Sequence, residues 1–132
     1  MSLPEKYKEI YISRTQEACK DDPVLSPALE KIFHDSVKGD EQSPMFVPYI
    51  WPTGHRGLPR TYFQVCGMDI LRDEDLIYEQ VLAENDVETK LGLYPGMPHI
   101  FWSTFSMLAQ GKKAAPDFVN GIKWLLDESS KS

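Results

Sequence analysis

The middle of the chain contains a segment that would be apolar on both faces of a strand. In residues 61–68, TYFQVCGM, an extended backbone carries apolar groups on both sides: Tyr62 and Cys66 on one, Phe63 and Val65 on the other. Such a stretch is typical of a strand that is covered on both faces, as in a parallel sheet. We therefore predict a buried strand over residues 61–68.

A helix and a second strand are predicted next. Residues 74–84 repeat apolar side chains at helical spacing, with Ile77 and Val81 one turn apart. Residues 87–94 alternate apolar and polar side chains, so this strand has one partly polar face and is expected near the edge of a sheet. The order strand, helix, strand, helix predicts an α/β fold with a right-handed parallel crossover.

Helical patterns lie at both ends of the chain. Residues 4–18 place apolar side chains at helical spacing behind Pro4, and Ser26-Pro27 can open a short helix. A last helix is predicted over residues 116–127. Residues 38–60 hold four prolines and three glycines, which predicts a long irregular connection.

These elements divide the chain into three parts of one expected partial domain, residues 1–132. They are a helical part (1–37), the irregular connection (38–60) and a strand-helix-strand-helix part (61–132). The length suits a single domain. Two strands make a small sheet, and a strand that is apolar on both sides needs neighbours. We therefore expect an incomplete sheet, as at the end of a larger domain.

Composition and charge exclude several classes of partner. The net charge of -6 and the pI near 5.0 leave no basic stripe for nucleic acid and disfavour an anionic membrane surface. No apolar run reaches the roughly 18 to 20 residues of a membrane span. Cys66 lies in an apolar run, and one possible bridge to Cys19 cannot be inferred from spacing, so a reduced, cytoplasmic protein is expected.

Two titratable side chains follow the two predicted strands. Asp69 comes directly after the first strand, and His99 follows the second strand thirty residues later. Functional groups gather beyond the carboxyl ends of parallel strands, and the crossover returns the chain to that edge of the sheet. A carboxylate on one imidazole nitrogen fixes the tautomer and leaves the other nitrogen free to take a proton from a nucleophile. The sequence therefore predicts contact between Asp69 and His99.

Two motifs around this pair resemble a known family. The first has the form G-x-D-x-L-R-D-E and the second P-H-x-F; they are formed here by Gly67, Asp69, Leu71, Arg72, Asp73 and Glu74, and by Pro98, His99 and Phe101. The chain is similar to the C-terminal part of the hormone-sensitive-lipase-like branch of the α/β-hydrolase fold, especially its fungal carboxylesterases. The resemblance implies that Asp69 is the acid and His99 the general base of a Ser-His-Asp triad. It also implies a small-molecule ester substrate and no cofactor.

The chain departs from the family pattern in the nucleophile region. It contains no G-x-S-x-G pentapeptide and no H-G-G-G-type oxyanion loop, and both are expected upstream of this chain. Met68 and Ile70 flank the acid where the family often has Leu and Pro, and Asp75 adds a charge to the acidic cluster. That cluster fits the start of a helix, because acidic side chains favour its positive end, so a site role for Asp73 is the less favoured interpretation.

Other candidate site residues carry weaker signals. Phe101 and Trp102 follow the base and are the best candidates for a substrate pocket, although most aromatic side chains serve packing. The three histidines show no metal-binding spacing, so no metal site is expected. Ser103 and Ser106 lie near His99, but FWSTFS lacks the glycine of a nucleophile turn, so no nucleophile is assigned within this chain.

Two functional hypotheses remain. In the first, the chain supplies the Asp and His of a serine carboxylesterase and is inactive without the nucleophile part. In the alternative, it is a truncated, non-catalytic chain that acts as an oligomerisation or binding module. Homo-oligomers would form through the edge strand 87–94 or the C-terminal helix, because missing strands leave apolar surface exposed.

Overall fold

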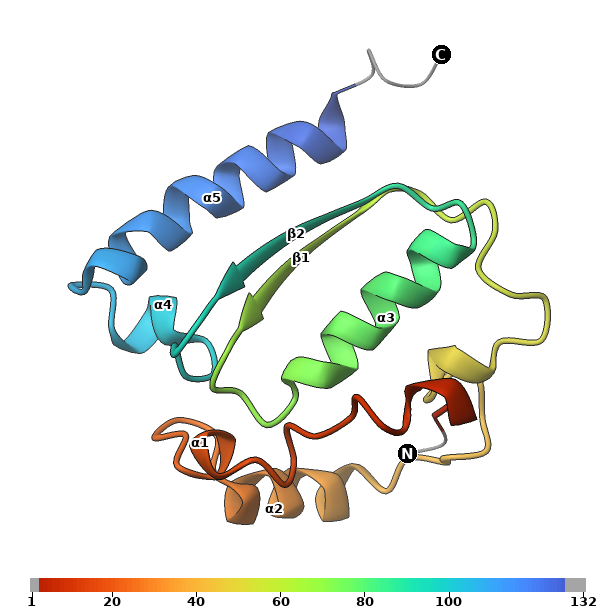
Figure 1. The fold of residues 1–132 in the computed structure, drawn as a ribbon, viewed down its shortest axis with the longest axis horizontal. Helices are drawn as coiled ribbons and strands as arrows, with labels where there is room; N and C mark the ends of the chain where they lie inside the picture. The colour runs from red at the N-terminus through yellow and green to blue at the C-terminus, as the bar shows by residue number, and fades with distance from the viewer. Residues whose placement is uncertain (1–2, 128–132) are drawn as a thin grey trace.

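A two-stranded parallel sheet lies at the centre of the computed structural model, which describes residues 3–127 (Figure 1). Strand β1 (Thr61–Cys66) pairs with β2 (Thr89–Tyr94) in a register that sets Phe63 beside Leu91 and Cys66 beside Tyr94. Helix α3 (Arg72–Glu84) makes the crossover between the strands. The predicted strand-helix-strand unit and the parallel pairing are confirmed.

Helices lie on opposite sides of this sheet, α3 on one and α5 (Ala109–Leu126) on the other (Figure 1). Towards α3, the ring of Phe63 meets Tyr78 edge-on with ring centroids 6.4 Å apart. Towards α5, the ring of Tyr62 lies against Gly121, where a Cβ would come within 2.3 Å of the ring. The apolar character of both sides of β1 is therefore explained by a helix on each face.

Two apolar clusters hold the helices in place. On the α3 side, Tyr7 from the start of the chain is buried with Ile77 and Val81. On the α5 side, Tyr94 and Phe101 are buried with Cys66 and Ala114. Removing a side chain the size of Ile77 from water stabilises the fold by roughly 1.5–3 kcal/mol. These clusters fix the strand ends from both faces.

The N-terminal segment differs from the prediction. Instead of one helix over residues 4–18, it forms a 3-10 turn, η1 (Glu5–Tyr7), then irregular backbone, then a short α1 (Glu17–Lys20). The cause is a competing acceptor: the backbone N–H groups of Ile12 and Ser13 donate to the Asp73 carboxylate at 2.7 and 2.6 Å. Amides held in this way cannot donate to carbonyls four residues earlier, as a helix requires.

Helix α2 (Pro27–Val37) begins where the sequence places it. Ser26 caps it, since its Oγ accepts the Leu29 N–H at 3.3 Å. None of the α2 residues is buried, and Phe33 and Val37 are largely exposed. The helix therefore presents much of its apolar side to solvent in this chain.

Two further elements complete the C-terminal part. The connection 38–60 contains a single 3-10 turn, η2 (Pro48–Ile50), as expected of an irregular segment. After β2, the short α4 (Phe101–Thr104) precedes α5. Helix α5 begins at Ala109, not at residue 116 as predicted, and Pro116 lies inside it. The earlier start follows from packing, because Gly111 and Ala114 are buried in its first turns.

Leucines on the second strand remain partly uncovered. The relative exposure of Leu91 is 41% and that of Leu93 is 45%, on the side of β2 that shares its face with Phe63 and Val65. Helix α5 likewise exposes Phe118 and Ile122. An incomplete sheet with apolar surface left open is therefore what the structure contains.

The two strand ends approach each other closely at Gly67. Its N–H donates to the Tyr94 carbonyl at 2.9 Å, and an added Cβ would lie 2.8 Å from the Pro95 Cα and 3.0 Å from the Gly96 nitrogen. These neighbours are backbone atoms and cannot rotate away. Glycine is thus required for the two loops to pass at this distance.

We expect Gly67→Ala to lower the free energy of unfolding by about 1–3 kcal/mol, because the methyl group would force the strand ends apart. Urea denaturation measures the loss. Gly92→Ala is the matched control, since its Cβ would meet the end of the Tyr62 side chain, 3.1 Å from the hydroxyl oxygen, and the nearest backbone atom is the Phe63 carbonyl oxygen at 3.7 Å. Equal losses in the two variants would contradict the close approach.

Candidate active site

The side chains of Asp69 and His99 meet at the carboxyl ends of the two strands. The Nδ1 atom of His99 lies 2.5 Å from Oδ2 of Asp69. The Asp69 side chain is 8% exposed and the His99 side chain 29%, so the acid is enclosed while the ring reaches the surface. The predicted contact is present, and it arises from the parallel crossover.

Main-chain hydrogen bonds hold Asp69 in place. The N–H of Met68 donates to the Met97 carbonyl at 2.9 Å, which ties the loop after β1 to the loop after β2. Oδ1 of Asp69 accepts the Leu71 N–H at 2.9 Å and turns the chain into α3. One carboxylate oxygen is used locally, and the other is left for the imidazole.

His99 is held through its own backbone and by its neighbours. Its N–H donates to Oδ2 of Asp22 at 2.7 Å, a contact between residues 77 positions apart. The next residue, Ile100, has φ 42° and ψ 37°, a left-handed conformation that is costly for a β-branched side chain. Phe101 is fully buried behind it. The ring therefore extends from a backbone that is fixed on both sides.

This geometry decides how the imidazole can act. An ionised carboxylate only accepts hydrogen bonds, so Nδ1 of His99 is the donor to Asp69. Nε2 is then the nitrogen with a free lone pair, and it can take up a proton from a neighbouring hydroxyl. A protonated ring would be stabilised by the adjacent carboxylate. The pair can thus work as a general base backed by an acid.

The acidic cluster after Asp69 organises structure around the pair. Arg72 donates from Nη1 to the Gly67 carbonyl at 3.0 Å and from Nε to Oδ1 of Asp73 at 2.7 Å. Burial by itself would raise the pKa of Asp73, but the bonds from Arg72 and from the amides of Ile12 and Ser13 outweigh it and leave the pKa below its usual value. Asp73 therefore anchors the N-terminal segment.

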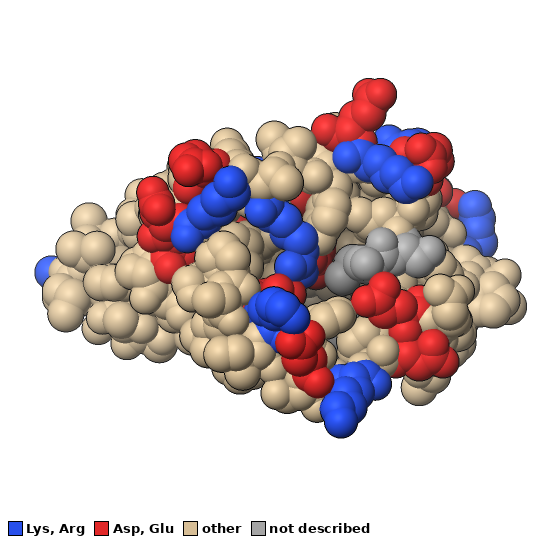
Figure 2. All heavy atoms as spheres, turned by 90° about the horizontal axis from the view of Figure 1, so that it is seen from below, with Lys and Arg blue, Asp and Glu red and all other residues tan. Residues whose placement is uncertain are grey.

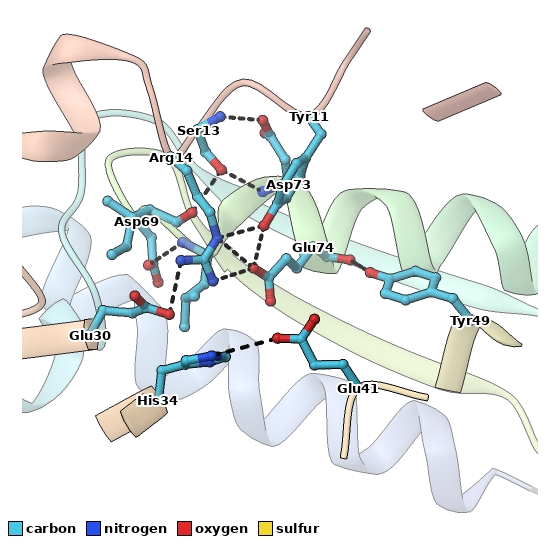
Figure 3. Close-up of polar contacts among 12 residues, drawn as sticks. Tyr11, Ser13, Arg14, Glu30, His34, Glu41, Tyr49, Asp69, Asp73 and Glu74 are labelled. Atoms are coloured by element: carbon cyan, nitrogen blue, oxygen red, sulfur yellow. Dashed lines mark hydrogen bonds and ion pairs between the residues drawn. The ribbon is translucent and has the colours of Figure 1, made fainter. Parts of the chain in front are cut away.

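Arg14 connects the N-terminal segment with α2 and α3, as Figure 3 shows. Its guanidinium donates to Glu74 of α3 at 2.7 Å and forms an ion pair with Glu30 of α2 at 2.9 Å. Tyr11 donates its hydroxyl proton to Glu74 at 2.7 Å. These contacts hold α2 across the start of α3, next to the loop that carries His99.

A cavity of about 610 Å³ opens beside His99, between α2 and the start of α3. Its charged wall includes Arg14, Glu30 and Glu74. Most of its exposed surface is apolar, and the apolar side chains come from α2, from the segments beside it and from the loop after β1: Leu25, Phe33, Val37, Phe46, Val47 and Leu71. A ligand in this cavity would have one end at the imidazole.

Phe101, a candidate for the substrate pocket from the sequence, is fully buried in the described structure. Its ring packs against Tyr94 at a centroid distance of 5.0 Å and against Trp102 at 5.3 Å, inside the α5-side cluster. Neither Phe101 nor Trp102 is among the residues that line the cavity beside His99. Phe46 was among the aromatic side chains that could line a pocket, whereas the cavity side chains on α2 were not anticipated, because no sequence pattern indicates that this helix returns to the strand ends.

The remaining candidates have structural partners. Ser103 Oγ donates to the Ile100 carbonyl at 2.9 Å within α4. His34 pairs with Glu41 at 3.5 Å, and His55 is buried with its ring edge-on to Tyr78. Over residues 3–127, no group of three or more His, Cys, Asp or Glu side chains is arranged to hold a metal ion.

Charged side chains of both signs lie on the molecular surface. On the face shown in Figure 2, small groups of cationic and of anionic side chains lie next to one another. Ion pairs between described residues include Lys31 with Asp35 at 2.7 Å. In the part of the chain that the structure describes, no helix is long and apolar enough to cross a membrane.

Comparison with known proteins places the chain in a family. Residues 4–103 match the family described as alpha/beta hydrolase fold, which is most of the chain. The chain belongs to this family. The chain is 41% identical over 109 residues to the AB hydrolase superfamily protein B1A11.02 of Schizosaccharomyces pombe, covering 83% of this chain. It is 33% identical over 131 residues to versiconal hemiacetal acetate esterase of Dothistroma septosporum, covering 96%.

Solved structures give the same assignment. The chain superposes on vibralactone cyclase with a TM-score of 0.84 and 36% identity, over 93% of this chain and 35% of the other. An esterase of the bacterial hormone-sensitive lipase family follows with a TM-score of 0.63 and 25% identity, over 78% and 34%. The expected resemblance to that branch is confirmed. The chain spans about a third of the length of the curated relatives, 32% and 38%.

Sequence reasoning missed Asp22 as part of this site. The residue is 3% exposed, and its Oδ1 accepts the N–H groups of Val24 and Leu25 at 2.7 and 3.0 Å. The pair Asp22-Pro23 is a turn signal, which would have identified the local role. The contact with His99 could not be found in this way, since it joins distant segments.

The lowered pKa of Asp73 predicts how stability depends on pH. The unfolded carboxyl has a pKa of about 3.9, and the folded one lies below it, so this group stabilises the fold above pH 4 and the contribution is lost as pH falls through the folded value. We expect Asp73→Asn to lower the unfolding free energy by about 1–3 kcal/mol at pH 7. The difference from the unmodified chain should shrink below about pH 4.

Chemical denaturation between pH 7 and pH 2 measures both quantities. Asp21→Asn, at an exposed position, is the control and should change stability by less than about 0.5 kcal/mol. A stability difference for Asp73→Asn that stays constant down to the lowest pH would contradict the assigned anchoring role.

Proposed function

We propose that this chain provides the acid and the base of a serine carboxylesterase, with Asp69 and His99 as two members of a Ser-His-Asp triad. The observation that carries the proposal is the 2.5 Å contact between Nδ1 of His99 and Oδ2 of Asp69 at the ends of two parallel strands. Its membership of the hydrolase family and its similarity to proteins named as esterases support the same chemistry.

His99 acts in turn as base and as acid, and Asp69 supports it throughout. Nε2 of His99 removes the proton from a serine hydroxyl as its oxygen attacks the ester carbonyl. The imidazolium is stabilised by Asp69 and gives the proton to the departing alcohol oxygen, which leaves an acyl-enzyme. Water then attacks the acyl group, with His99 taking its proton and returning it to serine. The products are a carboxylic acid and an alcohol.

The cavity beside His99 supports an ester substrate with an apolar group. Its volume of about 610 Å³ lies within the range of small-molecule sites, and its lining is mostly apolar. Arg14 is already neutralised by Glu30 and Glu74, so the cavity offers no uncompensated cation to a carboxylate ligand. Neutral acyl or alcohol groups therefore fit this wall better than anionic ones.

The serine has to come from outside residues 1–132, because the sequence contains no G-x-S-x-G turn. The proposal is tested in a chimera in which this chain replaces the region it matches in versiconal hemiacetal acetate esterase. We expect the chimera to hydrolyse p-nitrophenyl acetate. His99→Ala and Asp69→Asn should each lower kcat by roughly 10³-fold or more, since the triad acts as a unit.

Two controls accompany the chimera. Ser103→Ala should leave kcat unchanged, because this exposed serine donates to its own helix. The isolated chain should turn over no more ester than its own His99→Ala variant. A folded chimera whose activity survives the loss of His99 would refute the proposal, and so would an isolated chain far more active than the variant.

A second candidate function is favoured by the exposed apolar side chains. Leu91 and Leu93 on the edge strand and Phe118 on α5 are each more than 40% exposed. An edge strand with uncovered leucines is a surface on which copies of a chain pair. Under this alternative the chain is a non-catalytic oligomerisation module.

The two cysteines support a location for the protein. Both are free and buried, and burial raises the pKa of Cys66 to about 11. We therefore also propose a reducing, cytoplasmic location.

We expect the isolated chain to self-associate in sedimentation velocity, with a mean mass that rises with concentration. Leu91→Lys combined with Leu93→Lys should reduce association, because charge on an edge strand opposes pairing. Lys123→Ala, on exposed α5 surface, is the control. A monodisperse monomer that unfolds cooperatively would contradict both the association and this second function.

A further inference from the structure

The buried carboxylate of Asp22 accepts a hydrogen bond from the backbone of His99, the proposed base, although the two residues are far apart in the sequence. Asp22 lies between α1 and α2 and is 3% exposed. Its Oδ2 accepts the N–H of His99 at 2.7 Å, although 77 positions separate the two residues. Among residues 3–127, this is the one hydrogen bond between the N-terminal segment and the loop that carries His99.

The two oxygens of Asp22 serve different segments. Oδ1 accepts the N–H groups of Val24 and Leu25 and so folds the turn that leads to α2. Oδ2 is directed out of this turn, towards His99. A residue needed only for the turn would require one oxygen, since serine and threonine form the same type of turn with a single hydroxyl. The second oxygen therefore points to a role at the His99 loop.

Holding the His99 amide restricts where the ring can lie. The amide nitrogen is bonded to the Cα that carries the imidazole, and Asp69 holds the ring at Nδ1, 2.5 Å away. On the other side, Ile100 adopts its left-handed conformation and Phe101 is fully buried. Strained backbone of this kind persists only where its surroundings determine it strongly. The Asp22 bond supplies one of those constraints directly before the strained residue.

We propose that Asp22 is a positioning residue for His99, which fixes the backbone so that the imidazole stays against Asp69 with Nε2 presented to the proposed nucleophile. The proposal deepens the proposed function and rests on it for its catalytic meaning. The placement of the ring is a separate physical statement and can be measured without ester or serine. Reaction rates are sensitive to such placement, since a displacement of about 1 Å can cost roughly 10²-fold.

Two variants distinguish the role of Asp22 in its local turn from its hydrogen bond to the His99 backbone. Asp22→Asn and Asp22→Ser each keep one oxygen for the Val24 and Leu25 amides, but neither retains a second acceptor for the His99 N–H. Asp73→Asn is the matched control. Asp73 is another buried carboxylate that accepts two backbone amides, yet those amides belong to Ile12 and Ser13.

The readout is hydrogen exchange by NMR on the full 132-residue chain, for the His99 amide and the His99 Nδ1–H. In the unmodified chain both should be protected. In Asp22→Asn and Asp22→Ser, both exchange rates should rise by roughly tenfold or more, the amount expected when a bond to a charged acceptor is lost. Asp73→Asn should lower the melting temperature and leave both rates within about twofold after correction for its stability.

Several outcomes would overturn the proposal. Rapid exchange of the His99 amide in the unmodified chain would do so, and this measurement decides the question if neither Asp22 variant folds. Unchanged Nδ1–H exchange in a folded Asp22 variant would reduce Asp22 to a turn former. In the esterase chimera, Asp22→Asn should lower kcat more than it changes KM. An inactive chimera with the expected NMR changes would remove the esterase proposal and leave the positioning of the ring intact.

Discussion

The candidate site depends on how closely two strand ends can approach. The hydrogen bond from Gly67 to the Tyr94 carbonyl and the bond from Met68 to Met97 join the loops after β1 and β2 into one unit. Only a residue without a Cβ fits at the crossing, where the nearest backbone atom would be 2.8 Å away. Asp69 and His99 are carried by these two loops, so their 2.5 Å contact follows from main-chain geometry before any side-chain preference is considered.

Three aspartates in this structure have buried carboxylates that are stabilised by backbone N–H groups. A buried carboxylate is costly unless donors surround it, and each of these accepts backbone N–H groups: Asp22 three, Asp73 two and Asp69 one. Asp69 alone also faces the imidazole of His99. The number of amide donors therefore distinguishes Asp22 and Asp73, which hold distant backbone segments, from Asp69, which has an oxygen available for the His99 ring nitrogen.

The part of the fold that could be predicted from sequence is the part governed by local pattern. The strands, the crossover helix α3 and the Asp69–His99 contact followed from apolar periodicity and from the geometry of parallel strands. The N-terminal helix was wrongly predicted, because Asp73 competes for the amides of Ile12 and Ser13. The start of α5 was misplaced, because a proline signal was outweighed by the packing of the first turns. Hydrogen bonds to acceptors far along the chain, and the packing of α2 beside the strand ends, could not be predicted, because neither changes the periodicity of apolar residues.

The span of the bond between Asp22 and His99 has a consequence for the order of folding. The strand-helix-strand unit can bring the acid and the imidazole together by closing a loop of 30 residues, whereas the Asp22 bond closes one of 77. Contacts of high sequence separation carry a larger loop-closure entropy and tend to form late. His99 would then contact Asp69 early in folding, before its backbone is fixed. It would reach its final orientation only in the last step, when the N-terminal segment packs and Asp22 accepts the His99 N–H.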